Sequence, residues 1–167
     1  ITAVASLGNG GKLMTPYIVD KVLDEDGNII SETEPKVKRQ VISEKTADIM
    51  CDLMEQVVVW GTAKNAYVAG YHVAGKTGTS EKQPRGNGEY IASFIGFAPA
   101  DDPKIACLVM LDNPRGINYY GGVITAPVAG KIISETLQYY GIEPVYTDED
   151  LQEMDTTVPD VVGKTTD

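Results

Sequence analysis

The 167 residues are 43% apolar and 23% charged, which is the ordinary range for a chain that folds around one core. The formal net charge is −10, and the 14 Lys and Arg residues are scattered along the chain. This balance excludes the clustered basic surface that nucleic acids and anionic lipids need. No apolar run approaches the ~18 residues that span a bilayer, and residues 1–5 lack the basic start of a signal peptide.

The first third of the chain predicts a helix end, a hairpin and a long helix. Residues 1–7 have the pattern of a helix that the glycine-rich residues 8–11 stop. Residues 17–23 alternate as a strand does, and a turn at 24–28 returns the chain into Ile29 and Ile30. The polar residues 31–40 read as an exposed connector.

The long helix begins at Ser43, a good N-cap, and ends near Gly61. Apolar residues recur at spacings of three and four between these positions. A short strand at residues 57–59 is the alternative, which the preceding helical period disfavours.

The second half predicts three strands and a closing helix. Short apolar runs at 71–79, 91–98 and 105–111 are separated by turns, which indicates an antiparallel meander. A helix then starts at Thr125, has Pro127 in its first turn and stops at Gly141. Its expected buried residues are Val128, Ile132, Ile133, Leu137 and Tyr140. A helix packed on antiparallel strands gives an α+β fold.

Cysteine and histidine content argues against a metal site. Cys51 and Cys107 lie in apolar segments, which favours two buried thiols over a disulfide. His72 is the only histidine, and we expect it to be a packed or half-exposed strand residue. The sequence therefore predicts no bound metal and no cofactor.

One short motif carries chemistry: Lys76-Thr77-Gly78-Thr79, at the end of a predicted strand. Lys-Thr-Gly is one of three motifs of serine β-lactamases and penicillin-binding proteins. Read alone, Lys76 is also consistent with a charged residue that protects an edge strand, the threonines with ordinary strand formers and Gly78 with a bulge.

The surrounding sequence resembles the class B penicillin-binding proteins. The matching segments are residues 8–16, 61–64, 70–79, 94–99, 112–114 and 120–127. Together they cover nearly the whole chain in order, so the resemblance is far more specific than the four-residue motif. It implies the C-terminal portion of a β-lactamase/transpeptidase-like fold.

The resemblance also implies a reaction, in which a serine attacks the D-Ala-D-Ala amide of a peptidoglycan stem peptide and a second stem peptide resolves the acyl-enzyme. β-Lactams mimic the first substrate. In such an enzyme Lys76 would supply positive charge near the substrate carboxylate and assist proton transfer. Thr77 and Thr79 would donate hydroxyl hydrogen bonds, and the backbone N–H of Thr79 would face the oxyanion. Gly78 would let the substrate lie along the strand edge. We therefore expect Lys76 and Thr79 to be catalytic and the four residues Lys76, Thr77, Gly78 and Thr79 to bind substrate.

The chain lacks the other two motifs. None of the serines at positions 6, 31, 43, 80, 93 and 134 has Lys three residues later or Asn two residues later. We therefore expect an inactive C-terminal part of a transpeptidase, which needs the N-terminal half of the same domain. Without that half, an exposed hydrophobic face and open strand edges would favour self-association.

The end of the chain differs in character from the rest. Residues 146–157 are acidic and without period, as in a linker, and residues 158–167 resemble the start of a PASTA module. The expected organisation is a transpeptidase part at 1–145, a linker at 146–157 and a truncated PASTA module at 158–167. A PASTA tail is typical of division-type and sporulation-type members, which act outside the cell membrane and would be anchored by an upstream segment.

Two other functions remain open on sequence alone. One is a non-catalytic module that senses penicillin or binds the cell wall, and the other is a structural domain with a chance motif. Upstream Ser-x-x-Lys and Ser-x-Asn motifs would favour the enzyme, whereas an upstream kinase domain would favour a receptor.

Overall fold

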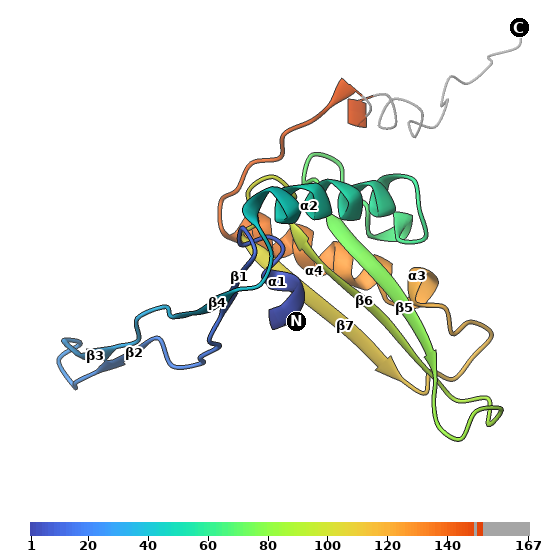
Figure 1. Ribbon diagram of the computed structural model, residues 1–167, viewed down its shortest axis with the longest axis horizontal. Helices are drawn as coiled ribbons and strands as arrows, with labels where there is room; N and C mark the ends of the chain where they lie inside the picture. Colours follow the sequence, from blue (N-terminus) through green and yellow to red (C-terminus); the bar gives the residue numbers. More distant parts are fainter. Residues whose placement is uncertain (149, 152–167) are drawn as a thin grey trace, which may run out of the picture.

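Three consecutive strands form the central sheet of the computed structural model, which describes residues 1–148, 150 and 151. They are β5 (Ala74–Glu81), β6 (Tyr90–Ala98) and β7 (Ile105–Asp112), paired antiparallel in the order β5-β6-β7. Thr77 lies opposite Phe94, and Phe94 lies opposite Val109. The predicted meander and the α+β class are both confirmed (Figure 1).

Helix α4 (Ala126–Tyr139) covers one face of the sheet, after the one-turn helix α3 (Gly121–Ile124). The predicted start and end are confirmed, and Ile133 and Leu137 are fully buried. The rest of the predicted face is wrong, because Val128, Ile132 and Tyr140 are exposed. Small residues replace them inside: Ala126, Ala129 and Gly130.

The buried face of α4 differs from the predicted one because the helix closely approaches the 3₁₀ turn η1 (Lys64–Ala66). A Cβ on Gly130 would lie only 3.0 Å from the carbonyl oxygen of Ala66. Small side chains permit this contact, and the larger apolar ones turn outward.

Helix α2 (Glu44–Val59) lies on the other face (Figure 1). The Ser43 hydroxyl accepts a hydrogen bond from Thr46 N–H at 3.2 Å, which confirms the predicted N-cap. Cys51 and Met54 pack against Ala74 and Phe97 of the sheet. Residues 57–59 are helical, so the alternative of a short strand there is wrong.

The N-terminal segment forms an arm that extends away from the sheet (Figure 1). After α1 (Thr2–Ala5), strand β1 (Lys12–Met14) pairs with β4 (Val37–Gln40), and β2 (Lys21–Leu23) pairs with β3 (Ile29–Glu32). The predicted hairpin is confirmed, although its first strand begins at Lys21 and not at residue 17.

The predicted connector at residues 31–40 is only partly a connector. Its first residues end β3 and its last four form β4. All four residues of β4 are exposed, so this strand lacks the apolar alternation by which a strand is recognised in a sequence. It forms because its backbone pairs with β1, more than twenty residues earlier in the chain.

The segment after α4 returns to the start of β5. Val145 N–H donates to the carbonyl of Gly70 at 2.8 Å, and Tyr67 donates its hydroxyl hydrogen to the buried carboxylate of Asp150. The predicted PASTA start at residues 158–167 lies outside the described residues.

Both cysteines are free thiols in the interior, as predicted. Burial raises the pKa of each. Among the helices of the described residues, none is both long and apolar enough to cross a bilayer.

Candidate active site: the open edge of β5

Strand β5 has β6 on one side only, so its other edge is open within the described part of the chain. Lys82 N–H donates to the Glu89 carbonyl at 2.8 Å, just beyond the end of the β5–β6 ladder. In an antiparallel pair every second residue bonds the neighbouring strand. Counting back from Lys82, Lys76 and Gly78 direct their backbone groups to β6, whereas those of Thr77 and Thr79 face the open edge.

Lys76 lies at this edge and is exposed. Its Nζ donates to the Thr77 carbonyl at 2.9 Å, which agrees with a carbonyl directed outward. Among the described residues this ammonium has no carboxylate partner. It is therefore available to an anionic ligand.

Thr77 and Thr79 share the face of β5 on which α3 lies, as two residues of equal parity must. The Thr77 hydroxyl is 3.2 Å from the hydroxyl of Thr62. The Thr79 hydroxyl accepts a hydrogen bond from Gly121 N–H at 3.1 Å. Both side chains are therefore fixed by partners outside β5.

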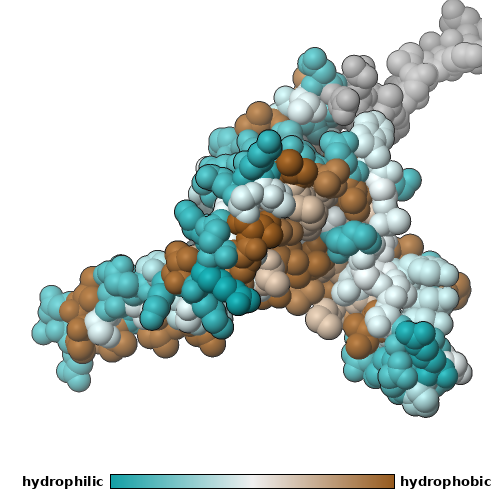
Figure 2. All heavy atoms as spheres, in the orientation of Figure 1, coloured by the Kyte–Doolittle hydropathy of each residue, from teal (hydrophilic) through white to brown (hydrophobic). Residues whose placement is uncertain are grey.

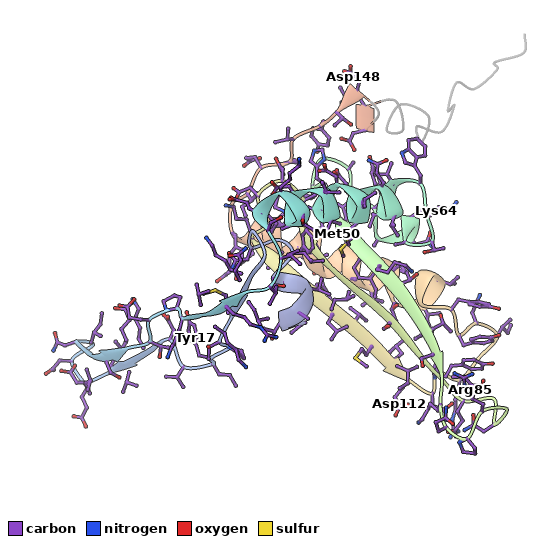
Figure 3. All side chains as sticks on the ribbon, in the orientation of Figure 1. Tyr17, Met50, Lys64, Arg85, Asp112 and Asp148 are labelled. Carbon is purple, nitrogen blue, oxygen red and sulfur yellow. The ribbon has the colours of Figure 1, made fainter. Side chains whose placement is uncertain are left out.

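A cleft of about 470 Å³ lies along this edge. Three of the four predicted site residues line it: Lys76, Thr77 and Thr79. Gly78 lies between the two threonines in β5. The cleft also has lining residues to which the sequence analysis gave no role: Gly61, Thr62, Lys64, Asn65, Tyr120, Gly122 and Val123. Figure 3 shows Lys64 just past the end of α2.

Most of the missed residues lie in sequence segments that carry the family resemblance, but the resemblance assigned them no role. Gly61, Thr62 and Lys64 lie in one segment that carries the family resemblance, and Tyr120 and Gly122 lie in another. Asn65 lies in neither segment. Only the fold shows that Asn65 contacts a residue 57 positions later.

His72 lies outside this cleft, in the turn before β5 with a φ of 45°. It is half-buried as predicted, but it does not belong to a strand. The ring nitrogens contact the Glu55 carboxylate at 2.8 Å and the Val145 carbonyl at 3.0 Å. His72 therefore joins α2 to the C-terminal segment.

The chemistry of the cleft is that of an anion site beside a backbone donor. Its lining includes the lysines Lys64 and Lys76 and the hydroxyls of three threonines. With the outward N–H of Thr79, these groups suit a carboxylate and a developing oxyanion. None of the serines in the chain has the activating lysine of a Ser-x-x-Lys motif. The described residues also contain no group of three His, Cys, Asp or Glu side chains that would hold a metal ion.

Residues 1–134 match the family model of the penicillin binding protein transpeptidase domain. The chain belongs to the penicillin-binding protein transpeptidase family. This membership argues against an unrelated structural domain, whereas the roles of Lys76–Thr79 stay a prediction. It also identifies the sheet and its helices as part of the transpeptidase fold.

Individual relatives agree with this assignment. The chain is 43% identical to stage V sporulation protein D of Bacillus subtilis over 148 residues, which cover 86% of the chain and 23% of that protein. It is 31% identical to a peptidoglycan D,D-transpeptidase FtsI homolog of Mesostigma viride, over 84% of the chain and 26% of that protein.

Solved structures give the same result. The ceftriaxone acyl-enzyme complex of penicillin-binding protein A from M. tuberculosis superposes with a TM-score of 0.76 at 30% identity. The match covers 82% of the chain and 31% of that structure. The chain thus spans between a fifth and a third of the length of these relatives.

Proposed function

We propose that the chain is the C-terminal part of the catalytic domain of a peptidoglycan D,D-transpeptidase. The observation that carries this proposal is the open edge of β5, where Lys76 and the outward backbone of Thr79 border one cleft. Relatives of the chain include proteins named peptidoglycan D,D-transpeptidases, and one solved relative is a β-lactam acyl-enzyme.

In this proposal Lys76 attracts the C-terminal carboxylate of a stem peptide and assists proton transfer at the serine. Thr77 and Thr79 donate hydroxyl hydrogen bonds to the same carboxylate. The outward N–H of Thr79 stabilises the oxyanion of the tetrahedral intermediate. Gly78 has no side chain, so the peptide can lie along β5 as an added strand.

The nucleophile comes from the other half of the domain. The serine of a Ser-x-x-Lys motif would attack the D-Ala-D-Ala carbonyl, release D-alanine and form an acyl-enzyme. The amine of a second stem peptide would then resolve it. A penicillin would enter by the same route and remain as a covalent adduct.

The remainder of the domain would also cover the free part of the sheet. On the Lys76 face, the apolar side chains of Ile91, Ile95, Leu108 and Met110 lie beyond the area that α1 and α2 cover. Met110 is 56% exposed and Leu108 is 39% exposed. Figure 2 shows apolar residues gathered on the face below α2. A surface of this kind marks a protein contact.

We further propose that the parent protein acts on the outer face of a bacterial membrane, held by a segment upstream of residue 1, and that residues 158–167 begin a PASTA module behind a linker at 146–157. The similarity to proteins named peptidoglycan D,D-transpeptidases supports a cell-wall role.

The direct test is a turnover assay on the longer parent protein with a stem peptide that ends in D-Ala-D-Ala. We expect one D-alanine released per cross-link, and inhibition by penicillin. A parent protein that binds penicillin covalently but never releases D-alanine would instead favour a penicillin-sensing module.

A further inference from the structure

The glycine pair Gly121–Gly122 packs closely against the backbone of β5, of β6 and of Thr62. A Cβ on Gly121 would lie 2.4 Å from the carbonyl oxygen of Ser93 and 2.5 Å from that of Gly78. A Cβ on Gly122 would lie 2.4 Å from the carbonyl oxygen of Thr62. Since neither glycine has a positive φ, close approach and not backbone conformation requires them.

This close approach allows two hydrogen bonds that link Asn65 to Thr79 through α3. Asn65 Nδ2 donates to the carbonyl of Gly122 at 2.7 Å. The preceding residue, Gly121, donates its N–H to the Thr79 hydroxyl at 3.1 Å. Asn65 therefore holds the segment that holds Thr79.

The hydrogen bond from Gly121 limits the directions in which the Thr79 hydroxyl can donate its hydrogen. A hydroxyl has one hydrogen to donate and two lone pairs to accept with. Because Gly121 N–H occupies a lone pair of Thr79, the hydroxyl hydrogen stays free for donation to a ligand in the cleft that Thr79 lines. The Thr62 and Thr77 hydroxyls lie 3.2 Å apart, and either can donate to the other. A hydrogen bond donated by Thr62 leaves the Thr77 hydrogen for a ligand in the cleft.

We propose that Thr62 and Asn65 are positioning residues, which orient the hydroxyls of Thr77 and Thr79 toward the carboxylate of the stem peptide. This inference rests on the proposed function, because it assigns the two threonines to that carboxylate. Thr62 and Asn65 need not touch the substrate. Their contribution is preorganisation, since a donor that already points at its ligand loses no orientational freedom on binding.

The test compares two ligands in the full-length parent protein. Benzylpenicillin carries the carboxylate, and its methyl ester lacks the negative charge. The variants are Thr62→Val, which removes the hydroxyl at nearly constant shape, and Asn65→Ala. Thr62→Ser restores the hydroxyl, and Asn87→Ala is a matched control in the β5–β6 loop, outside the cleft. The second-order acylation rate is followed by intact mass.

We expect Thr62→Val and Asn65→Ala each to acylate about 3- to 10-fold more slowly with benzylpenicillin, the worth of one neutral hydrogen bond. With the methyl ester, both variants should stay within about twofold of the unaltered protein, as no charged group depends on the hydroxyls. Thr62→Ser should recover most of the lost rate, and Asn87→Ala should change neither rate. If Asn65→Ala does not fold, Asn65→Leu removes the donor at similar size without adding a charge and carries the same expectation.

The outcomes separate this inference from the proposed function. Equal losses with both ligands, or unchanged rates with both, would overturn the positioning role while leaving the transpeptidase assignment intact. A parent protein that forms no adduct at all, even unaltered, would overturn the proposed function and this inference with it.

Discussion

Lys76 is the charged residue of the β5 motif, and its substitution gives the largest predicted effect. In the parent protein, Lys76→Ala should slow acylation by penicillin by at least ~100-fold, since both the carboxylate contact and proton transfer are lost. The measurement is the rate of adduct formation with a fluorescent penicillin.

Lys82→Ala provides the matched control. Lys82 follows the end of β5, and its ammonium pairs with Asp112 at 2.8 Å. Figure 3 shows Asp112 at the end of the sheet away from Lys64. This variant should acylate at the unaltered rate, because surface ion pairs contribute little. Similar losses in both variants would show that Lys76 acts only through general charge or stability.

His72 predicts a pH dependence of stability. Both of its partners, the Glu55 carboxylate and the Val145 carbonyl, are acceptors, so only the doubly protonated ring satisfies both. Burial lowers the pKa of His72, but the hydrogen bonds to Glu55 and Val145 and the charges of Glu55 and Asp101 outweigh it, and the pKa is raised above 6.5. The histidine therefore stabilises the fold fully below pH 6.5, and this contribution is lost as the pH rises through the raised pKa.

The check is urea unfolding of the unaltered chain and of His72→Gln at a series of pH values. The difference in free energy of unfolding should favour histidine at about pH 5.5 and shrink by about pH 8.5. His72 is the only histidine in the chain, so the difference isolates its titration. A difference that is constant with pH would contradict the protonated bridge.

The sequence identifies the site residues of β5 but not those that support them. Lys76, Thr77, Gly78 and Thr79 are contiguous and match a motif, so a local pattern finds them. Thr62 and Asn65 act through contacts with residues 15 and 57 positions away. Such contacts exist only once residues 62–65 lie beside β5 and α3, and no spacing in the sequence encodes them.

At the scale of elements, the predictable parts are those that local patterns specify. Helix α2 has a serine cap and a helical apolar period, and the three sheet strands have apolar runs between turns. The pairing of β4 with β1 has neither signal, because β4 has a single apolar residue, Val37, and is exposed on both strand faces. The prediction of the buried face of α4 is wrong because the close contact with η1 leaves room only for small residues.

The packing of β5 against β6 predicts unequal effects for two glycines. A Cβ on Gly75 would lie 2.3 Å from the buried ring of Phe94, and one on Gly78 only 2.6 Å from the Ser93 hydroxyl. The Phe94 ring has no room to move, whereas the serine side chain can rotate. We expect Gly75→Ala to lower the free energy of unfolding by about 1–3 kcal/mol and Gly78→Ala to cost less.

Urea unfolding of both variants, at one temperature, measures the difference. The Gly78→Ala variant serves as the control, since it adds the same methyl group to the same strand. Equal losses would contradict the packing of Gly75 against Phe94.

At the scale of the whole molecule, the uncovered sheet face predicts self-association of the 167-residue chain. Met110→Lys should raise the monomer fraction, because it places a charge on the exposed apolar face. Ile117→Lys is the control, as Ile117 is fully exposed in a loop outside this face. Light scattering over a concentration series measures the effect. A chain that is monomeric without either substitution would contradict the prediction.

The central claim is that this chain supplies the substrate-binding edge and another part of the protein supplies the serine. Intact mass and peptide mapping after penicillin treatment test it most directly, on the 167-residue chain and on the longer parent protein. We predict no adduct on the chain alone, and one penicilloyl group on the parent, attached to a serine upstream of residue 1. An adduct on any of the six serines of this chain, or none on the parent protein, would contradict the account.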